Sequence, residues 1–169
     1  MGLLDKIMNK INSDGTNVEA GVLYSPMSGK IIPLEQIPDD VFSQGILGPG
    51  IGIEPTEGFV VSPVNGTITS VADSKHAIGI QSDEGAEILI HVGMDTVDMN
   101  GDGFSVDIRS NQHVSCGQKL MSFSIDKIKK ANHPATTAIV LTNADEFPDF
   151  KIDVIGEIAA KEKIGAIMQ

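Results

Sequence analysis

Two histidines carry the side chains with the clearest chemical potential in this sequence. His76 lies in S74-K-H-A-I-G-I80 and His91 lies in E87-I-L-I-H-V-G-M-D95, with one obvious turn, S82-D-E-G85, between them. Imidazole is a nucleophile and a metal ligand near neutral pH, so two facing imidazoles can hold a group that neither ring holds alone. The relative position of the two rings therefore decides what this segment can do.

Two turn geometries give opposite predictions for this pair. A two-residue loop at Asp83-Glu84 places His76 directly opposite His91, with Cβ atoms roughly 4.5–5.5 Å apart. A three-residue loop closed by Gly85 in the left-handed region shifts the pairing by one residue, which is expected to move the rings to opposite faces of the sheet. The residues by themselves leave both registers open.

Alternation along the second strand indicates which way His91 faces. Ile88, Ile90 and Val92 share one side, which is typical of a core-facing strand surface. Leu89 and His91 share the other side. We therefore expect His91 to face outward or into a shallow surface depression.

The same pair suggests a zinc-dependent hydrolase as an alternative function. A catalytic zinc usually has three protein ligands and a water, whereas the sequence offers no third ligand at a suitable spacing and no HxH or HExxH element. We expect no cofactor to be required. Zinc held by His76 and His91 and completed by a partner's carboxylate is a further hypothesis, as is a regulatory binding module without chemistry.

Composition limits the classes of partner. The chain has 169 residues, 41% of them hydrophobic and only 4% aromatic, with a net charge of -11. Acidic surface and scarce aromatic rings argue against nucleic-acid binding and favour positively charged protein partners. The single cysteine, Cys116, cannot form an internal disulfide, and the sequence shows neither a signal peptide nor a membrane span, so we expect a cytoplasmic protein.

The chain is predicted to form two parts. Residues 1–12 have apolar residues at helical spacing and predict a short amphipathic helix within a flexible segment, 1–17, capable of at most weak contact with a membrane surface. Residues 18–169 alternate short β-branched runs with Gly, Pro, Asn and Asp, which indicates a single all-β domain, a sandwich or a barrel. One interior helix is expected at 124–131.

An internal repeat supports this architecture. S25-P-M-S-G-K-I31 recurs as S62-P-V-N-G-T-I68, and in both copies a turn precedes a strand. We interpret the repeat as a duplicated β-motif, because self-similarity at a fixed offset usually marks architecture. A further turn is expected in H113-V-S-C-G-Q-K-L120, where Gly117 would close a hairpin. His113 and His133 lie beside turn signals and are expected on the surface or as capping residues.

Taken together, the motifs resemble the glucose-class enzyme IIA of the bacterial phosphoenolpyruvate-dependent sugar phosphotransferase system. The pairing of H-A-I with H-V-G-M-D-T is the most specific part of the resemblance. It implies an antiparallel β-sandwich or barrel with an internally duplicated motif, and it favours the register in which the histidines face each other. The motifs that carry it are M1-G-L-L-D-K6, S25-P-M-S-G-K-I31, I37-P-D-D-V-F42, G48-P-G-I-G-I53, S62-P-V-N-G-T-I68, K75-H-A-I-G-I80, H91-V-G-M-D-T96 and G101-D-G-F104.

The resemblance also implies a phosphoryl relay. His91 matches the family histidine that accepts a phosphoryl group from the phosphocarrier HPr and passes it to a cysteine of the sugar-specific IIB domain. His76 matches a second histidine that contacts the phosphoryl group, and Ser74 stands where relatives carry Thr or Ser supporting that histidine. Asp39 and Asp95 match acidic residues that meet arginines of the partner proteins.

A relay site should expose apolar residues around its histidines, because docking then expels water and protects the phosphoryl group from hydrolysis. Val41, Phe42, Ile46 and Leu47 are the candidates for this apolar ring. Ala72 and Leu89 stand where some relatives carry phenylalanine, so we expect docking of HPr and IIB to survive, whereas regulatory targets that depend on aromatic contacts stay an open question. The transported sugar cannot be read from this sequence, since sugar contacts lie in another domain.

Overall fold

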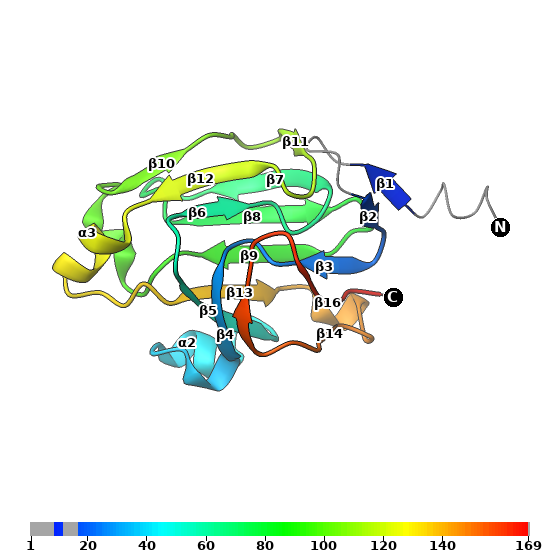
Figure 1. The fold of residues 1–169 in the computed structure, drawn as a ribbon, viewed down its shortest axis with the longest axis horizontal. Helices are drawn as coiled ribbons and strands as arrows, with labels where there is room; N and C mark the ends of the chain where they lie inside the picture. Colours follow the sequence, from blue (N-terminus) through cyan, green and yellow to red (C-terminus); the bar gives the residue numbers. More distant parts are fainter. Residues whose placement is uncertain (1–8, 12–16, 169) are drawn as a thin grey trace.

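The computed structural model describes residues 9–11 and 17–168, and it describes side chains from Val18 onward. As predicted, antiparallel strands make up most of the fold (Figure 1). The strands are β1 (Asn9–Ile11), β2 (Asn17–Glu19), β3 (Val22–Tyr24), β4 (Gly29–Pro33), β5 (Gly50–Pro55), β6 (Phe59–Val61), β7 (Gly66–Val71), β8 (Ala77–Ser82), β9 (Glu87–His91), β10 (Phe104–Val106), β11 (His113–Val114), β12 (Lys119–Phe123), β13 (Thr137–Leu141), β14 (Lys151–Ile152), β15 (Gly156–Ile158) and β16 (Lys163–Ala166). The helical segments are η1 (Leu34–Gln36), α2 (Asp40–Ser43), η2 (Thr96–Met99), α3 (Ile125–Lys130) and η3 (Ala144–Glu146).

The sheets form a sandwich with an internal two-fold arrangement. The large sheet has eight strands in the order β11-β7-β8-β9-β13-β5-β4-β15, and two three-stranded sheets have the orders β10-β12-β6 and β14-β16-β3. In the large sheet, the strands β11, β7, β8 and β9 of one half correspond in order to β15, β4, β5 and β13 of the other half. One small sheet belongs to each half. Apolar side chains from all three sheets fill one continuous core.

The predicted duplication is confirmed at atomic detail. The Ser25 hydroxyl donates to the Met27 carbonyl at 2.7 Å, and the Ser62 hydroxyl donates to the Val64 carbonyl at 2.6 Å. Both serines are completely buried. Each hydrogen bond satisfies a buried hydroxyl and shapes the turn that takes the chain from a small sheet into the large one.

A second pair of equivalent segments, residues 113–120 and 157–164, was missed in the sequence. The Ser62 amide donates to the Gln118 carbonyl at 2.8 Å, and the Ser25 amide donates to the Glu162 carbonyl at 2.7 Å. The two segments have very few identical residues, so comparing their sequences did not reveal that they are equivalent. The expected hairpin at Gly117 is wrong, since β11 pairs with β7 in the large sheet and β12 pairs with β6 and β10 in a small one.

The two predicted helices have different outcomes. The interior helix is confirmed as α3, and the Ser124 hydroxyl caps it by accepting a hydrogen bond from the Lys127 amide. The N-terminal helix is wrong over Asn9–Ile11, which form β1 and pair with β2. An isolated helix of this length is marginal in water, so strand pairing prevails over its apolar spacing. The other residues of this predicted helix, 1–8 and 12, lie outside the described part.

None of the helices in the described part of the chain has the length and apolar character needed to span a bilayer.

Gly66 begins β7 where two backbones approach closely, and we predict that Gly66→Ala destabilises the fold. A Cβ at this position would lie 2.3 Å from the Gln81 carbonyl oxygen on β8. Forcing the strands apart should lower the free energy of unfolding by about 1–3 kcal/mol in urea denaturation. Thr67→Ala, one residue further along the strand and half-buried, is the matched control and should change stability by less. Equal effects of the two substitutions would contradict the packing argument.

Candidate functional site

The β8–β9 hairpin that carries the histidines has a three-residue loop. Ala77 pairs with His91, and Gln81 pairs with Glu87, so the favoured two-residue register is wrong by one residue. Gly85 adopts a positive φ of 102°, and its amide donates to the Ser82 carbonyl at 2.9 Å. Glycine takes this left-handed conformation without strain, which is why the longer loop forms.

The two imidazole rings nevertheless meet. Their centroids lie 4.8 Å apart, with an interplanar angle of 83°, in an edge-to-face arrangement. Strand alternation would have separated them, but His76 precedes β8 and follows a turn in which Lys75 has a φ of 64°. The His76 carbonyl accepts a hydrogen bond from the Val92 amide at 2.7 Å, which ties the turn to the end of β9. The turn, not the strand, therefore orients the His76 ring.

His91 is half-buried at the end of β9, on the side of the sheet opposite the core, as strand alternation predicted. Its Nδ1 lies 2.9 Å from the Gly93 carbonyl oxygen. Because a carbonyl oxygen only accepts, this hydrogen bond places the proton of the neutral ring on Nδ1 and leaves a lone pair on Nε2. In this arrangement Nε2 is the nitrogen of the His91 ring that could act as a nucleophile or as a ligand.

Gly93 and Thr96 hold this carbonyl in place. Gly93 has a φ of 76°, and a Cβ there would lie 2.4 Å from the Thr96 methyl group. The buried Thr96 hydroxyl donates to the Val92 carbonyl at 2.6 Å. The turn after β9 is thus closed by one side-chain hydrogen bond and admits only glycine at its tightest point.

Burial favours the neutral form of both rings. Burial lowers the pKa of His91, and the neighbouring His76 lowers this pKa further, while the Gly93 carbonyl and the Asp39 carboxylate partly oppose the shift. Burial also lowers the pKa of His76, and the backbone of Ser74 partly opposes this shift. Among the described residues, no group forms a hydrogen bond of ordinary geometry with the buried Nδ1 of His76. Neutral imidazoles are the forms that can act as nucleophiles.

The two acidic residues of interest take different positions. Asp39 caps α2, and its carboxylate accepts hydrogen bonds from the amides of Val41 at 2.9 Å and Phe42 at 3.2 Å. It is also close enough to His91 to influence the pKa of that ring. Asp95 is exposed at the start of η2, with a left-handed φ of 61°.

Ser74 lies in the turn that leads to His76. Its side chain is half-buried, and it directly precedes Lys75.

The expected apolar ring is only partly exposed. Val41, Ile46 and Leu47 are exposed, with Ile46 showing 65% of its surface. Phe42 was expected with them but is only 5% exposed, and its ring centroid lies 5.0 Å from that of His91. It therefore packs against the His91 ring beneath the surface and is not part of the exposed apolar group.

The segment containing Phe42 lies over the outer face of the large sheet. Phe42 and Ile37 form a small cluster with Met94 and with Ala138 and Val140 of β13. The sequence predicted no helix here because α2 has only four residues. Burial of this cluster fixes the α2 segment, and with it Asp39 and the exposed apolar residues, beside the histidines.

Val97 was missed as a site candidate. It lies in η2 close to Asp95 and is 56% exposed.

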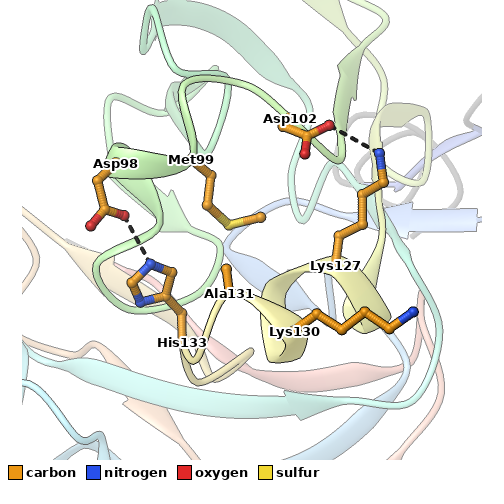
Figure 2. A pocket seen from close by; sticks show the side chains of 7 residues that line it. All are labelled: Asp98, Met99, Asp102, Lys127, Lys130, Ala131 and His133. Carbon is orange, nitrogen blue, oxygen red and sulfur yellow. Dashed lines mark hydrogen bonds and ion pairs between the residues drawn. The ribbon is translucent and has the colours of Figure 1, made fainter.

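Two ion pairs hold η2 and the loop that follows it, as Figure 2 shows. Asp98 pairs with His133 at 2.8 Å, and Asp102 pairs with Lys127 at 2.9 Å, around a hollow of about 500 Å³.

The two remaining histidines have different surroundings. His133 was expected on the surface or as a capping residue; its side chain is only 16% exposed and pairs with Asp98. His113 is exposed as expected and pairs with Asp83 at 3.0 Å.

A metal centre at this site would need help from another molecule. Among the described residues, no group of three or more His, Cys, Asp and Glu side chains is arranged to hold a metal ion. Within the described residues, the zinc-hydrolase alternative therefore finds no set of the three protein ligands that such enzymes usually have. Zinc bridged between His76, His91 and a partner's carboxylate stays a hypothesis.

Comparison with known proteins assigns the chain to a family. Residues 21–147 match the family model described as phosphoenolpyruvate-dependent sugar phosphotransferase system, EIIA 1. The chain belongs to this family.

Several relatives are similar in sequence to this chain over most of its length. A glucose-specific EIIA component of Staphylococcus aureus is 38% identical over 86% of this chain and 89% of its own length. The beta-glucoside-specific EIIBCA component of Bacillus subtilis is 42% identical over 86% of this chain, which spans only 24% of that longer protein. Glucose permease IIA from Mycoplasma capricolum has the same fold, with a TM-score of 0.77, 31% identity, and coverage of 85% of this chain and 93% of its own.

The lowered histidine pKa values predict a loss of stability in mild acid. Below the ordinary histidine pKa of about 6.5, the unfolded chain takes up protons at His76 and His91 while the folded chain resists them. The free energy of unfolding should therefore fall as the pH drops from 7 toward 5. The double variant His76→Gln/His91→Gln lacks both groups and should lose less stability over the same interval, measured by urea denaturation at each pH. Parallel losses in the two proteins would contradict the prediction.

Proposed function

We propose that this protein is a phosphoryl carrier of a sugar phosphotransferase system, with Nε2 of His91 as the acceptor atom. The observation that carries the proposal is the His91 ring, whose proton is held on Nδ1 by the Gly93 carbonyl and which lies edge to face with the His76 ring. Family membership supports the same role, since relatives are named as components of such systems. HPr is the proposed donor, and a cysteine of a sugar-specific IIB domain is the proposed acceptor.

The first transfer needs no cofactor. The Nε2 lone pair of His91 attacks the phosphorus of phosphorylated HPr, and the phosphorus–nitrogen bond of the donor breaks with its electron pair returning to the donor imidazole. The His91 ring, now substituted on Nε2 and protonated on Nδ1, carries positive charge that the Gly93 carbonyl stabilises. In the second transfer the IIB thiolate attacks phosphorus, and the electron pair of the breaking bond returns to Nε2.

His76 is proposed to position the phosphoryl group. Phosphoryl transfer has a loose transition state, so catalysis depends on in-line positioning and on neutralising the equatorial oxygens. The His76 and His91 rings meet edge to face, and in the neutral form one ring nitrogen of His76 carries a hydrogen that can bond to these oxygens. Arginines of HPr or IIB supply the remaining positive charge across the interface.

The surface around the histidines suits partners that are basic near their own active groups. Val41, Ile46 and Leu47 provide apolar contact, and Asp39 and Asp95 provide negative charge beside them. The net charge of -11 would also steer a cationic surface toward the chain. We propose the cytoplasm as its location, in keeping with a sequence that contains one cysteine, Cys116.

Fused relatives support the IIB domain as the second partner. The beta-glucoside-specific EIIBCA component and a glucose-specific EIICBA component of Streptococcus pneumoniae both match this chain, and it spans 24% and 20% of their lengths. Their names place IIA in the same polypeptide as IIB and IIC. This chain is proposed to serve an equivalent IIB domain, whether or not the two are covalently joined.

Replacing the acceptor should abolish phosphorylation. We predict that wild-type protein incubated with phosphoenolpyruvate, enzyme I and HPr gains an acid-labile, base-stable label, and that His91→Gln gains none, because glutamine has no nucleophilic nitrogen. His113→Gln, in which an exposed histidine outside the site is changed, is the matched control and should label normally. Label that persists in His91→Gln would exclude His91 as the acceptor.

Replacing His76 should separate the two transfers. We predict that His76→Gln still accepts label from HPr but passes it to a purified IIB domain much more slowly, by about 10²-fold or more, because one positioning hydrogen bond is lost. Quench-flow transfer to IIB measures this step. Onward transfer at the wild-type rate would refute the positioning role of His76 while leaving His91 as the acceptor.

A further inference from the structure

The duplicated halves of the fold contain two equivalent grooves, and the structure shows an occupant in one of them. In the first groove, Val18 of β2 packs against Tyr24 and Cys116 and is only 4% exposed. The Glu19 amide donates to the Tyr24 hydroxyl at 3.1 Å, and the Glu19 carboxylate pairs with Lys163 at 3.3 Å. The occupant is thus an extended segment in which an aliphatic residue is followed by an acidic one.

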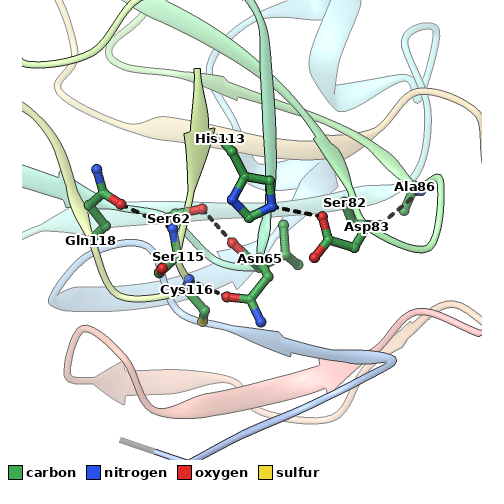
Figure 3. Close-up of polar contacts among 10 residues, drawn as sticks. Ser62, Asn65, Ser82, Asp83, Ala86, His113, Ser115, Cys116 and Gln118 are labelled. Atoms are coloured by element: carbon green, nitrogen blue, oxygen red, sulfur yellow. Dashed lines mark hydrogen bonds and ion pairs between the residues drawn. The ribbon is translucent and has the colours of Figure 1, made fainter. Parts of the chain in front are cut away.

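The same framework of hydrogen bonds surrounds the second groove. In the first half, the Cys116 amide donates to the Asn65 side-chain carbonyl at 2.8 Å, as Figure 3 shows. In the second half, the Ala160 amide donates to the Ser28 hydroxyl at 3.0 Å. Ser28 and Asn65 occupy the same position in the two repeated motifs, so Ala160 is the counterpart of Cys116.

The cation that binds the occupant is duplicated as well. Lys163 pairs in register with Tyr24, and Lys119 pairs in register with Val61, each just before a bulge in its strand pairing. Lys163 pairs with Glu19 at 3.3 Å, whereas Lys119 pairs at the longer distance of 3.8 Å with Asp107 among the described residues. The Lys119 side chain is 54% exposed. Lys119 is therefore placed to bind an acidic residue at the position equivalent to Glu19.

In the part of the chain that the structure describes, the second groove is open to solvent. It forms a mainly apolar hollow of about 490 Å³, and Phe59 and Val61 of β6 contribute to its wall together with Ala160. None of its lining residues belongs to the histidine site. Among the described residues, the groove is covered in one half and open in the other, and an open apolar groove is a candidate docking surface.

We propose that this second groove binds an extended segment of a partner protein, in which an aliphatic residue is followed by an acidic residue. The aliphatic side chain would contact Val61 and Ala160, as Val18 contacts Tyr24 and Cys116 in the first groove. The acidic side chain would pair with Lys119. The proposal is independent of the phosphoryl relay, because it uses other residues.

A second copy of this chain is a poorer occupant. Its β2 segment could enter the open groove only by leaving its own, where Val18 and the Lys163–Glu19 pair are already satisfied. Such an exchange uncovers as much apolar surface as it covers and gains no net burial. A separate partner segment, free before binding, gains the full burial.

A peptide that copies the first occupant tests the proposal. We expect the acetylated and amidated hexapeptide Thr-Asn-Val-Glu-Ala-Gly, added to the ¹⁵N-labelled full chain, to cause saturable chemical-shift changes at the amides of Val61, Lys119 and Ala160. The amides of Tyr24 and Cys116 should not move, because their groove is already filled. Absence of saturable changes in the second groove, or changes confined to the first, would overturn the proposal.

Charge reversal distinguishes specific docking from general apolar contact. A hexapeptide with lysine in place of glutamate should bind the wild-type chain about threefold to fivefold more weakly, as expected for loss of an exposed ion pair. Lys119→Glu should reverse this preference, and the matched control Lys163→Glu should not. A preference unaffected by Lys119→Glu would overturn the proposed ion pair and with it the occupant.

Filling the groove gives a second, independent check. Ala160→Trp should abolish the shift changes at Val61 and Lys119 while the far-UV circular dichroism spectrum confirms that the chain is folded. Phosphorylation of His91 by HPr should be unchanged in this variant, so failure of the groove and failure of the relay remain distinguishable. Undiminished peptide binding in folded Ala160→Trp would place the peptide elsewhere and refute the docking site.

Discussion

The hydrogen bond between His91 Nδ1 and the Gly93 carbonyl is the interaction on which the site depends. It decides which nitrogen of a neutral ring is free, and burial makes the neutral ring the prevailing form. The geometry of the carbonyl depends in turn on a left-handed Gly93 and on the Thr96 hydroxyl that closes the turn. One backbone oxygen thus connects a local turn to the chemistry of the site.

The site is an asymmetric addition to a nearly symmetric scaffold. The chain between β7 and β8 is a tight turn that delivers His76, whereas the equivalent connection between β4 and β5 is longer and contains α2. This longer connection folds over β9 and β13 and brings Phe42 against His91. The duplicated motif therefore forms the large sheet, and the candidate site forms because the β4–β5 connection is longer than the β7–β8 connection.

The same reasoning applies to the two grooves. Equivalent turns build equivalent walls, and the hydrogen bonds of Ala160 and Cys116 show how closely the backbone has been preserved between the halves. The side chains differ, since Tyr24 lies where the other half has Val61. Only the first groove has β2 beside it in the described part of the chain. A repeated fold can in this way present one filled and one open version of a single surface.

Sequence patterns on the strands predicted much of this fold. The inward face of β9, with Ile88 and Ile90, and the capped helix α3 follow from strand alternation and from a serine before a helical run, which are local properties. The repeated Ser-Pro turns also predicted the duplication. These signals are reliable because each depends on residues close together in the chain.

Other features depended on contacts that no local pattern encodes. The hairpin register could not be chosen from the turn residues, since Gly85 suits either loop. Phe42 was expected on the surface, yet burial against Met94 and β13 determines its place. The N-terminal helix gave way to a strand because pairing with β2 outweighs a marginal helical preference.

The sequence by itself was enough to identify the two histidines, the glycine in the turn after His91, and the alternating strand that carries His91. Only the tertiary structure decided that the rings meet, because His76 lies on a turn outside the strand, where the two-residue side-chain period no longer applies.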